Sequence, residues 1–542
     1  DLASTSIQLH SEPLRRAAAQ ARACLLALAV EYLNVKNSEQ LTVQAGVVST
    51  LAGQSDASVS YAQLIAHQHI RLVLDLTADV KAAEKYTVVG QSLPRVDIPG
   101  KATGELTFVH DMRMPGMLHG RVIRPPYAGV DHGEFIGNLL ESVDESSIAH
   151  IPGIRAVVVI RDFIGVVAER EEHAEQAAND LLITWKSWPG LPDVTNLENA
   201  LRNNPATPRR LVEEGNVDEA LRDADQNMAR TYIWPYQMHA SMGPSCAVAD
   251  WQGAQVSAEH PYRLTVWAGT QNPHVLRADL ARLSGLADYE IEIVRMEAAG
   301  CYGRNGADDV AADALLLSRA VGAPVRVQLT REQENLWEPK GAAQLMDMRG
   351  GLNPDGSIAA YDFSTSYPSN GAPTLALLLT RTIEPQAVTY EMGDRTARPP
   401  YNIDNLRVTV NDMPAILRAS WLRGVSALPN SFAHESYIDE LATAAGVDPL
   451  EFRLRYLDDP RARELLQATA DKASWQTHSA PQQQQVEGDI LSGQGLAYAR
   501  YIHSKWPGFG AAWSAWVADV DVNRKTGEVH VKRVVVGHDA GM

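Results

Sequence analysis

The chain has 542 residues, a mass of 59.1 kDa and 45% hydrophobic residues, which is enough to bury several cores in about two to four domains. Its formal charge of -18 and pI of about 5.4 argue against nucleic acid as a partner, because binding phosphates requires a basic face. The three cysteines, Cys24, Cys246 and Cys301, form no CxxC pair, which excludes a disulfide framework and an iron–sulfur or structural zinc site built by this chain. The longest apolar run, residues 23–30, is far shorter than a membrane span, so no transmembrane helix is expected.

The first part of the chain predicts one helix and then a polar stretch. Residues 11–33 begin with a serine N-cap and carry apolar side chains at helical spacing, which predicts an amphipathic helix. Residues 41–92 are polar and alternating, and they end in a strand-like run at 86–90. Residues 94–126 alternate Pro and Gly with short apolar runs. We therefore expect a domain boundary near residue 90.

The middle of the chain predicts two domains of different type. Residues 151–170 favour two buried strands, and residues 171–185 a helix followed by a strand, so a small α+β domain is expected to end near Trp185. Residues 187–210 are rich in Pro and Asn and predict a connection. Beyond it we expect a larger α/β domain, in which a strand at 291–296 leads through a glycine-spaced loop into a helix and the next strand.

That loop, "MEAAGCYGRNGADD", places glycines at Gly300, Gly303 and Gly306. Backbone N–H groups of residues 300–303, close to a helix N-terminus, could hold a phosphate or a cofactor oxygen. The loop is neither a Walker loop nor GxGxxG, and the absence of GxGxxG argues against a nicotinamide dehydrogenase. A turn that needs small residues for packing explains the spacing equally well, so both interpretations remain open.

Two further stretches carry candidate polar groups. "WPYQMHASMGPSC" places Gln237 and His239 at alternating positions of a short extended run, where a structural role is the default interpretation. "ILRASWLRGVSALPN" places Arg418 and Arg423 in a loop before a helix expected from about Ser431. Such arginines are either salt-bridge partners or anion clamps. Spacing does not separate these two roles.

Together these motifs resemble a known family. "AAGCYGRNGADD…LLLSRAVGAPVRVQLTRE", the Gln of "YQMH", the Arg of "SWLRGVSALPNSFAHESYIDELA" and "VDIPGKATGELTFVHDMRMPGMLHGRVIRPP" are similar to the molybdopterin-binding large subunit of the xanthine dehydrogenase/aldehyde oxidase family. The resemblance is strongest to the bacterial branch that includes isoquinoline 1-oxidoreductase beta subunits and the corresponding nicotinate dehydrogenase subunits, and it runs over essentially the whole chain.

The resemblance implies an α+β and α/β multidomain fold, with a small hammerhead-like domain and larger mixed-sheet molybdopterin-binding domains. The order of segments is that of this branch, in which a piece of the last domain precedes the small one. We expect an N-terminal segment of a molybdopterin-binding domain at residues 1–90 and the hammerhead-like domain at 91–186. A linker is expected at 187–225, molybdopterin-binding domain I at 226–470, and the start of domain II at 471–542.

The resemblance also implies roles for individual residues. The family loop reads Gly-Gly-Gly-Phe-Gly and contacts the molybdenum centre and its pterin. In this chain Ala298 and Ala299 replace two of its glycines, and Tyr302 replaces the Phe. Gln237 is expected to hydrogen-bond the apical oxo ligand, Arg423 to hold the region near the pterin or substrate, and the pterin rather than the protein to supply the metal's sulfur ligands. The remaining expected cofactor contacts are Gly300, Cys301, Gly303, Ser4, Thr5, Ser6 and Gln8, and the substrate-pocket candidates are His239, Arg304 and Asn305.

The function implied by the resemblance is water-derived hydroxylation of an N-heteroaromatic, nicotinate-like small molecule. The implied cofactor is molybdenum–molybdopterin in its cytosine dinucleotide form. Electrons are expected to pass to [2Fe–2S] clusters of a small partner subunit and then to a c-type cytochrome. Aldehyde oxidation by the same cofactor is one alternative, and a non-catalytic assembly or degenerate subunit is another. We expect a cytoplasmic or periplasmic protein. Any attachment to the inner membrane is expected to be peripheral and to occur through its partners.

The catalytic glutamate of the family is not among the residues of this chain. It belongs to a Gly-x-Gly-Glu loop that would follow Met542, and a Gly-Gln-Gly pterin loop would precede Asp1. The chain shows no signal-peptide pattern and begins and ends inside polar or strand-like segments. We therefore expect either a longer polypeptide or a second chain to complete the site, and no turnover by these residues alone.

Overall fold

The computed structural model describes residue 6 and residues 10–51, 57–67, 69–257, 261–481, 484–501 and 512–541. These residues form two compact units, which meet between Ile98 and Pro99 in the sequence. In the part of the chain described, no helix is both long enough and apolar enough to cross a membrane.

The N-terminal unit is a helix packed on a small sheet. The helix expected at 11–33 is α1 (Ser11–Tyr32), and its Ala29 packs with Val48, Val59 and Leu64 in a small core. The sheet has the order β1-β2-β3. The strand expected at 86–90 does not form, because this short run finds no pairing strand among the described residues and leaves its valines exposed. The remaining elements are β1 (Leu41–Gln44), β2 (Val47–Thr50), β3 (Ser58–Ser60), α2 (Tyr61–Ile65) and the 3-10 turns Ser38–Gln40 and Ala83–Lys85.

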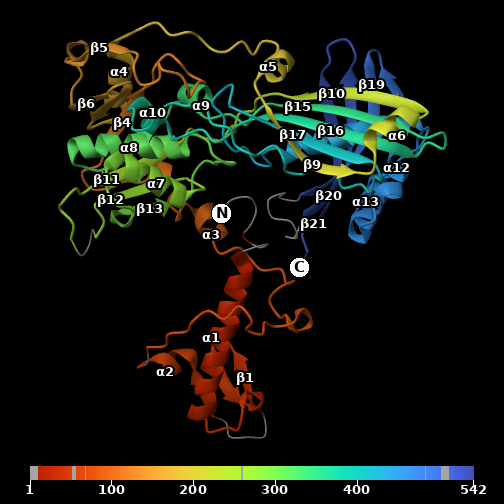
Figure 1. Ribbon diagram of the computed structural model, residues 1–542. Helices are drawn as coiled ribbons and strands as arrows, with labels where there is room; N and C mark the ends of the chain where they lie inside the picture. Colours follow the sequence, from red (N-terminus) through yellow and green to blue (C-terminus); the bar gives the residue numbers. More distant parts are fainter. Residues whose placement is uncertain are drawn as a thin grey trace. The chain divides into compact units, whose positions relative to one another are not determined.

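A seven-stranded mixed sheet organises the first half of the larger unit (Figure 1). Helices α7 (Pro273–Ser284) and α8 (Ala307–Val321) pack on one face, and α4 (Glu171–Asp180) packs on the other. Gly120 and Gly165 lie under α8, where a side chain on either would collide with Leu317. In sheet order the strands are β13 (Ile291–Arg295), β12 (Leu264–Ala268), β11 (Cys246–Trp251), β14 (Val325–Gln328), β4 (Leu118–Ile123), β7 (Phe163–Ala168) and β6 (Ile154–Ile160).

This sheet crosses the domain boundary expected at residue 186. Strand β14 pairs in parallel with β4, with Val325 opposite Leu118, so strands from both sides of residue 186 form one layer over one core. The helix and strand expected at 171–185 are α4 and β8 (Leu182–Trp185), and β8 pairs with β5 (Leu140–Asp144). Short helices α3 (Ile98–Thr103) and α10 (Leu375–Leu379), with 3-10 turns at Val109–Asp111, Glu145–Ile148 and Asp288–Glu290, complete this half.

A five-stranded sheet begins the second half, in the order β10-β15-β16-β17-β9. The linker expected at 187–225 instead contains α5 (Leu197–Asn203), the edge strand β9 (Thr207–Glu214) and α6 (Val217–Asp223). The sequence predicts a connection where β9 forms. The strand that pairs with it, β17 (Leu406–Met413), follows about two hundred residues later, so no local signal marks β9. The other strands are β10 (Gln226–Trp234), β15 (Gln344–Leu352) and β16 (Ile358–Pro368).

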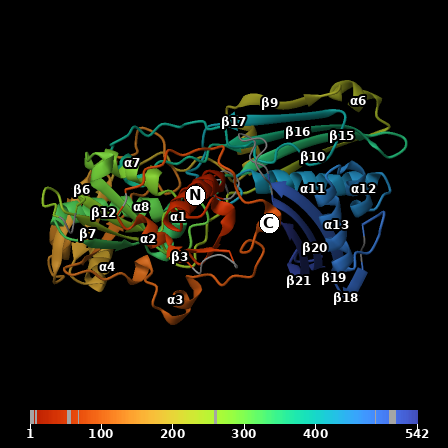
Figure 2. The same cartoon turned by 90° about the horizontal axis from the view of Figure 1, so that it is seen from below.

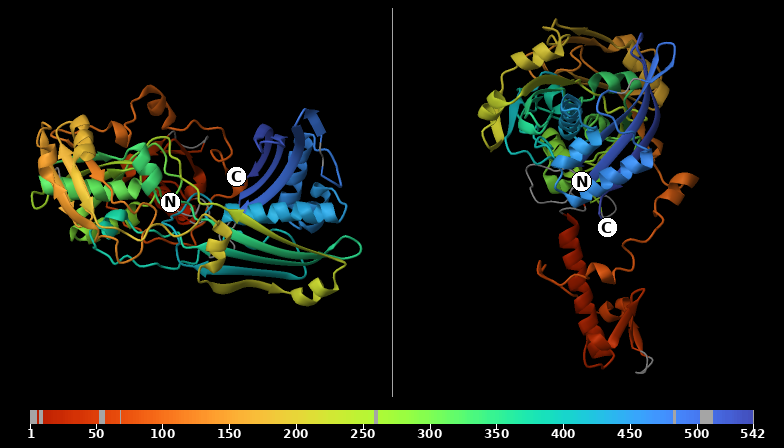
Figure 3. Two further views of the ribbon diagram at one scale, coloured as in Figure 1. Left: turned by 90° about the horizontal axis from the view of Figure 1, so that it is seen from above. Right: turned by 90° about the vertical axis from the view of Figure 1, so that its right-hand side faces the viewer.

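Three helices pack with this sheet and a four-stranded C-terminal sheet; the first contacts strands of both sheets, and the last packs on the C-terminal sheet (Figures 2 and 3). They are α11 (Ala427–Ala444), α12 (Pro449–Tyr456) and α13 (Pro460–Ala473). Asp448 caps α12 by accepting the N–H groups of Leu450 and Glu451. One continuous core joins both sheets to the helices. The C-terminal strands are β18 (Gln484–Glu487), β19 (Ile490–Tyr501), β20 (Ala512–Asn523) and β21 (Val529–Asp539).

Candidate functional site

The glycine loop connects β13 to α8, but the helix begins only at Ala307. Its first turn is filled by its own acidic residues, Asp308 and Asp309, and Asn305 Oδ1 accepts the Ala307 N–H at 3.0 Å. The N–H of Gly303 donates to Gln271 Oε1 at 2.6 Å. Gly303 therefore lies four residues before the helix with its N–H already bonded, and anion binding by residues 300–303 stays a prediction.

Close packing explains one of the glycines directly. Gly303 has φ +134°, and a Cβ at this position would lie 1.9 Å from the Trp421 carbonyl oxygen. The same carbonyl accepts the N–H of Arg304 at 2.8 Å. Only a residue without a side chain allows this approach. For Gly303, the packing interpretation of the loop is sufficient.

The two alanines that replace family glycines each face a glycine. A Cβ on Gly269 would lie 2.4 Å from the Ala298 Cβ, and one on Gly243 would lie 3.0 Å from the Ala299 Cβ. The methyl groups thus occupy space that glycines leave open on the opposite segments. The substitutions are accommodated locally, and they give no sign of a collapsed loop.

Isolated bridges join four chain segments around Gln237. Gln237 pairs with Gly341, Lys340 with Ala419, and Gly303 with Leu422. The Gln237 side chain is half-buried, and among the described residues its amide Nε2 makes only a long contact, 3.5 Å to the Pro235 carbonyl. This amide can therefore donate to another acceptor.

The structure separates the two loop arginines. Arg418 is 2% exposed, donates to Asp309 at 3.0 Å and donates to the Trp337 carbonyl at 2.6 Å. Arg423 is exposed, and its guanidinium lies over the Tyr302 ring, 5.4 Å from the centroid. Arg418 is a salt-bridge partner, whereas Arg423 presents a cation beside the loop.

Two substrate-pocket candidates, Arg304 and Asn305, are buried supports of the loop. Arg304 donates to Asp308 at 3.0 Å, and Asn305 caps α8. The Cys301 thiol points to the Asn305 amide oxygen at 3.3 Å, and burial raises its pKa to about 11, so it is not a thiolate at neutral pH. These contacts assign the three side chains to the loop's interior and not to an accessible pocket wall.

The third substrate-pocket candidate, His239, is also buried. Its Nε2 lies 2.8 Å from the Trp421 carbonyl oxygen, which gives it a contact inside the chain. Of the predicted N-terminal contacts, Ser6 is exposed in the N-terminal unit. Ser4, Thr5 and Gln8 lie outside the described residues.

Three residues that were not predicted from the sequence organise this site. Gln271 holds the Gly303 amide, Trp421 supplies the central carbonyl, and Glu338 accepts the backbone N–H of His239 at 2.9 Å. Gln271 directly follows the turn after strand β12, a position that often carries binding groups in α/β folds. No sequence signal marks Trp421 or Glu338, because their roles depend on contacts far along the chain.

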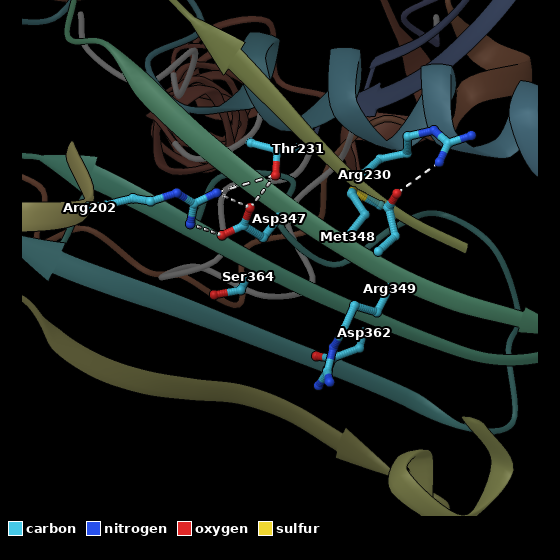
Figure 4. A pocket seen from close by; sticks show the side chains of 9 residues that line it. Arg202, Arg230, Thr231, Asp347, Met348, Arg349, Asp362 and Ser364 are labelled. Carbon is cyan, nitrogen blue, oxygen red and sulfur yellow. Dashed lines mark hydrogen bonds and ion pairs between the residues drawn. The ribbon is translucent and has the colours of Figure 1, made fainter. Parts of the chain in front are cut away.

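Two cavities are relevant to the location of the site. A small one of about 20 Å³ lies between Gly341, Leu422 and Arg423, enough for roughly one water molecule. A groove of about 490 Å³ lies on the outer face of the five-stranded sheet (Figure 4). Its floor carries exposed ion pairs such as Arg202 with Asp347 at 2.8 Å, and none of the predicted site residues lines it.

Comparisons with known proteins agree on one family. A model described as molybdopterin cofactor-binding domain matches residues 201–457. The chain is 61% identical, over 542 residues, to a nicotinate dehydrogenase subunit of Pseudomonas putida, covering all of this chain and 45% of that protein. It is 26% identical to the isoquinoline 1-oxidoreductase beta subunit of Brevundimonas diminuta, covering 98% of this chain and 69% of that one.

The fold is also found in solved structures. The aldehyde oxidoreductase of Desulfovibrio gigas matches with a TM-score of 0.61 at 15% identity, covering 82% of this chain and 68% of that one. This likeness shows that the two chains share a fold. The chain spans less than half the length of the nicotinate dehydrogenase subunit that it matches.

Proposed function

The chain belongs to the xanthine dehydrogenase/aldehyde oxidase family of molybdopterin-binding subunits, and on that premise we propose that it forms part of a hydroxylase acting on an N-heteroaromatic, nicotinate-like substrate. The observation that carries the proposal is the 61% identity to the nicotinate dehydrogenase subunit along the entire chain. The chain spans only 45% of that relative, so the activity is proposed for the complete protein.

The residues at the site fit an anionic cofactor that brings its own metal ligands. Among the described residues no group of three or more His, Cys, Asp and Glu side chains is placed to hold a metal ion. What the site does offer is the Gln237 amide, with its single long contact, and the exposed Arg423 guanidinium. Amide and guanidinium donors recognise oxo and phosphate oxygens. Molybdenum–molybdopterin, when bound, would supply the two-electron oxidation that hydroxylation with water requires.

The roles of this chain's own residues follow from these contacts. Gln237 would donate its amide to an oxygen of the bound cofactor, and Arg423, held over Tyr302, would place a positive charge beside the pterin or the substrate carboxylate. Asp308 and Arg304 fix the loop from below. We further propose the cytosine dinucleotide form of the cofactor, a small [2Fe–2S] partner and a c-type cytochrome as acceptor. The three cysteines of this chain, none in a CxxC pair, support a partner that carries the clusters.

The facing alanine and glycine pairs bear on the non-catalytic alternative. The altered glycine loop is the main reason to consider a non-catalytic subunit. Ala298 and Ala299, however, fit against Gly269 and Gly243, so the loop keeps its packing despite the two substitutions. Aldehyde oxidation ranks second, because the identity to aldehyde oxidoreductases is 26% or less, compared with 61% to the nicotinate dehydrogenase subunit.

The proposal is tested by measuring molybdenum and pterin per polypeptide on the complete enzyme, purified with its partner subunits. We expect one molybdenum per chain, and turnover of nicotinate that exceeds turnover of simple aldehydes. A complete enzyme without molybdenum would overturn the cofactor assignment and support a scaffold. One that contains molybdenum and prefers aldehydes would overturn the substrate assignment alone.

A further inference from the structure

One backbone carbonyl joins three segments of the site. The Trp421 oxygen accepts the Arg304 N–H at 2.8 Å and lies 2.8 Å from His239 Nε2. It also occupies the space where a side chain of Gly303 would be. The segment with Gln237, the glycine loop and the loop with Arg423 therefore meet at the Trp421 carbonyl. We call this contact the Trp421 junction.

The junction fixes the tautomer of His239. A carbonyl oxygen only accepts, so the Nε2 atom of His239 must carry the hydrogen. Burial lowers the pKa of His239 to about 4 and the Lys340 charge lowers it further, although contacts with the Trp421 and Pro339 carbonyls work in the opposite direction. At neutral pH the ring is therefore uncharged, and its Nδ1 atom is a bare acceptor.

Glu338 faces that bare acceptor. Its Oε1 accepts the His239 backbone N–H at 2.9 Å, and its Oε2 lies 3.8 Å from His239 Nδ1. Both side chains are buried, and neither Oε2 nor Nδ1 has a hydrogen-bond partner among the described residues. Two unpaired acceptors facing each other in a dry interior are unfavourable. A proton on Oε2 removes the conflict, and a side-chain movement of about 1 Å completes the hydrogen bond.

We propose that Glu338 and His239 act as a proton-sharing positioning pair, in which protonated Glu338 donates to His239 Nδ1 and His239 Nε2 donates to the Trp421 carbonyl. The pair holds the Trp421 junction, and with it the relative placement of Gln237, the glycine loop and Arg423. Its relevance to a cofactor rests on the proposed function, whereas the contacts themselves do not. Neither residue touches the reacting atoms, so both are positioning residues.

The charged groups around the pair define how it responds to pH. Burial raises the pKa of Glu338 to about 7, Lys340 lowers it and Glu334 raises it. Lys340 donates to the carbonyls of Asn335 and Glu338 at 2.6 Å and 2.9 Å. Glu334 accepts from Ser245.

The sign of the pH effect follows from the raised pKa of Glu338. The folded protein binds this proton more tightly than the unfolded chain, whose glutamate pKa is about 4.5. Its contribution is complete below that pH and is lost as the pH rises through about 7. The lowered pKa of His239 acts in the opposite direction between about 4 and 6.5. A comparison of wild type with variants at position 338 isolates the pH-dependent contribution of Glu338 from that of His239.

The test is hydrogen–deuterium exchange of the complete enzyme, followed in peptides that cover residues 300–306 and 419–425. Glu338→Gln keeps an acceptor for the His239 N–H and a donor for Nδ1 but cannot titrate. Glu338→Leu removes both. Glu332→Gln removes an exposed carboxylate from the neighbouring helix, α9 (Arg331–Trp337), and serves as the charge control.

We expect Glu338→Leu to raise the exchange of the Arg304 amide by about tenfold or more, as for the loss of a buried hydrogen bond, while Glu332→Gln leaves it unchanged. After correction for intrinsic exchange, wild-type protection should fall relative to that of Glu338→Gln as the pH rises from about 4.5 to 7. Unchanged protection in Glu338→Leu, or an equal pH dependence in Glu338→Gln, would overturn the pair. If Glu338→Leu does not fold, the comparison of wild type with Glu338→Gln decides.

Molybdenum per chain, measured on the same samples, separates this inference from the proposed function. We expect Glu338→Leu to retain less molybdenum than Glu338→Gln. A wild-type enzyme without molybdenum, but with the exchange pattern expected above, would refute the proposed function and leave the pair in place.

Discussion

The support of the glycine loop and the outer face of the five-stranded sheet are both built from arginine–aspartate pairs, but at opposite extremes of burial. Beneath the loop, the side chains of Arg418 and Asp309 are 2% and 5% exposed. On the outer face, those of Arg202 and Asp347 are 40% and 38% exposed. The pairs have the same chemistry, yet the buried charges depend on partners within the protein, whereas water can replace either partner at the surface.

The pKa values of two carboxyls, Asp313 and Asp347, show how burial and ion pairing oppose each other. Burial raises the pKa of Asp313 in α8, although Arg124 donates to it at 2.5 Å. At Asp347 burial also opposes ionisation, but hydrogen bonds from Arg202 and Thr231 outweigh it and lower the pKa. An ion pair alone therefore does not reveal what it contributes. The balance decides: desolvation outweighs the arginine at Asp313, whereas hydrogen bonds outweigh desolvation at Asp347.

Breaking the buried pair should give the largest effect. Arg418→Met leaves Asp309 charged and without its arginine, and it removes the bond to the Trp337 carbonyl. We expect a loss of about 3–5 kcal/mol in the free energy of unfolding, measured by urea denaturation. Arg423→Met, an exposed arginine of the same loop, is the control and should lose less than about 1 kcal/mol. Equal losses in the two variants would contradict the role of burial.

Gly303→Ala tests the close approach on which the junction depends. The methyl group would lie 1.9 Å from the Trp421 carbonyl oxygen, at φ +134°. We expect a loss of about 2–3 kcal/mol from steric conflict and backbone strain together, seen as a lower thermal midpoint. Gly285→Ala separates the two causes, because Gly285 has φ +77° with nothing within 4 Å, and it should lose only about 1 kcal/mol. Similar losses would show that strain alone limits Gly303.

The elements that the sequence predicted well are those with local signals. Periodicity and a serine at its start located α1. Strand β9, inside the predicted linker at 187–225, was not predicted, because it has no local apolar pattern and pairs with the distant β17. The pairing of β14 with β4 across residue 186 was not predicted for a related reason, since a parallel pairing leaves no trace in either strand alone.

The same distinction applies to the site. The glycine loop, Gln237 and Arg423 were predicted from motifs, while Arg418 could not be told from Arg423 by spacing. Glu338 and Trp421 could not be predicted at all, because their significance lies in one carboxyl and one carbonyl that meet His239 only after folding. Buried polar junctions of this kind depend on tertiary contacts and not on sequence period.

Gln237→Ala tests a residue whose expected role is in turnover and not in stability. Gln237 adjoins the buried cluster, but its amide makes only a long contact of 3.5 Å among the described residues, so its loss should hardly change stability. In the complete enzyme we expect turnover to fall by more than about tenfold, the effect of removing one preorganised donor. Steady-state kinetics with nicotinate provides the measurement, and Met238→Ala, an exposed neighbour, is the control. Unchanged turnover would refute the assignment of Gln237.

Arg202→Met should give the smallest effect, although Arg202 holds its partner in a bidentate pair. It contacts Asp347 through two nitrogens at 2.8 Å each (Figure 4). Because both side chains are more than one-third exposed, water replaces most of what is lost, and we expect less than about 1 kcal/mol at neutral pH. The lowered pKa of Asp347 makes this contribution disappear as the pH falls through that pKa, so wild type and variant should converge in acid-unfolding curves. A loss as large as that of Arg418→Met would mean that the groove in Figure 4 is desolvated in solution, and that the two regions are not opposites.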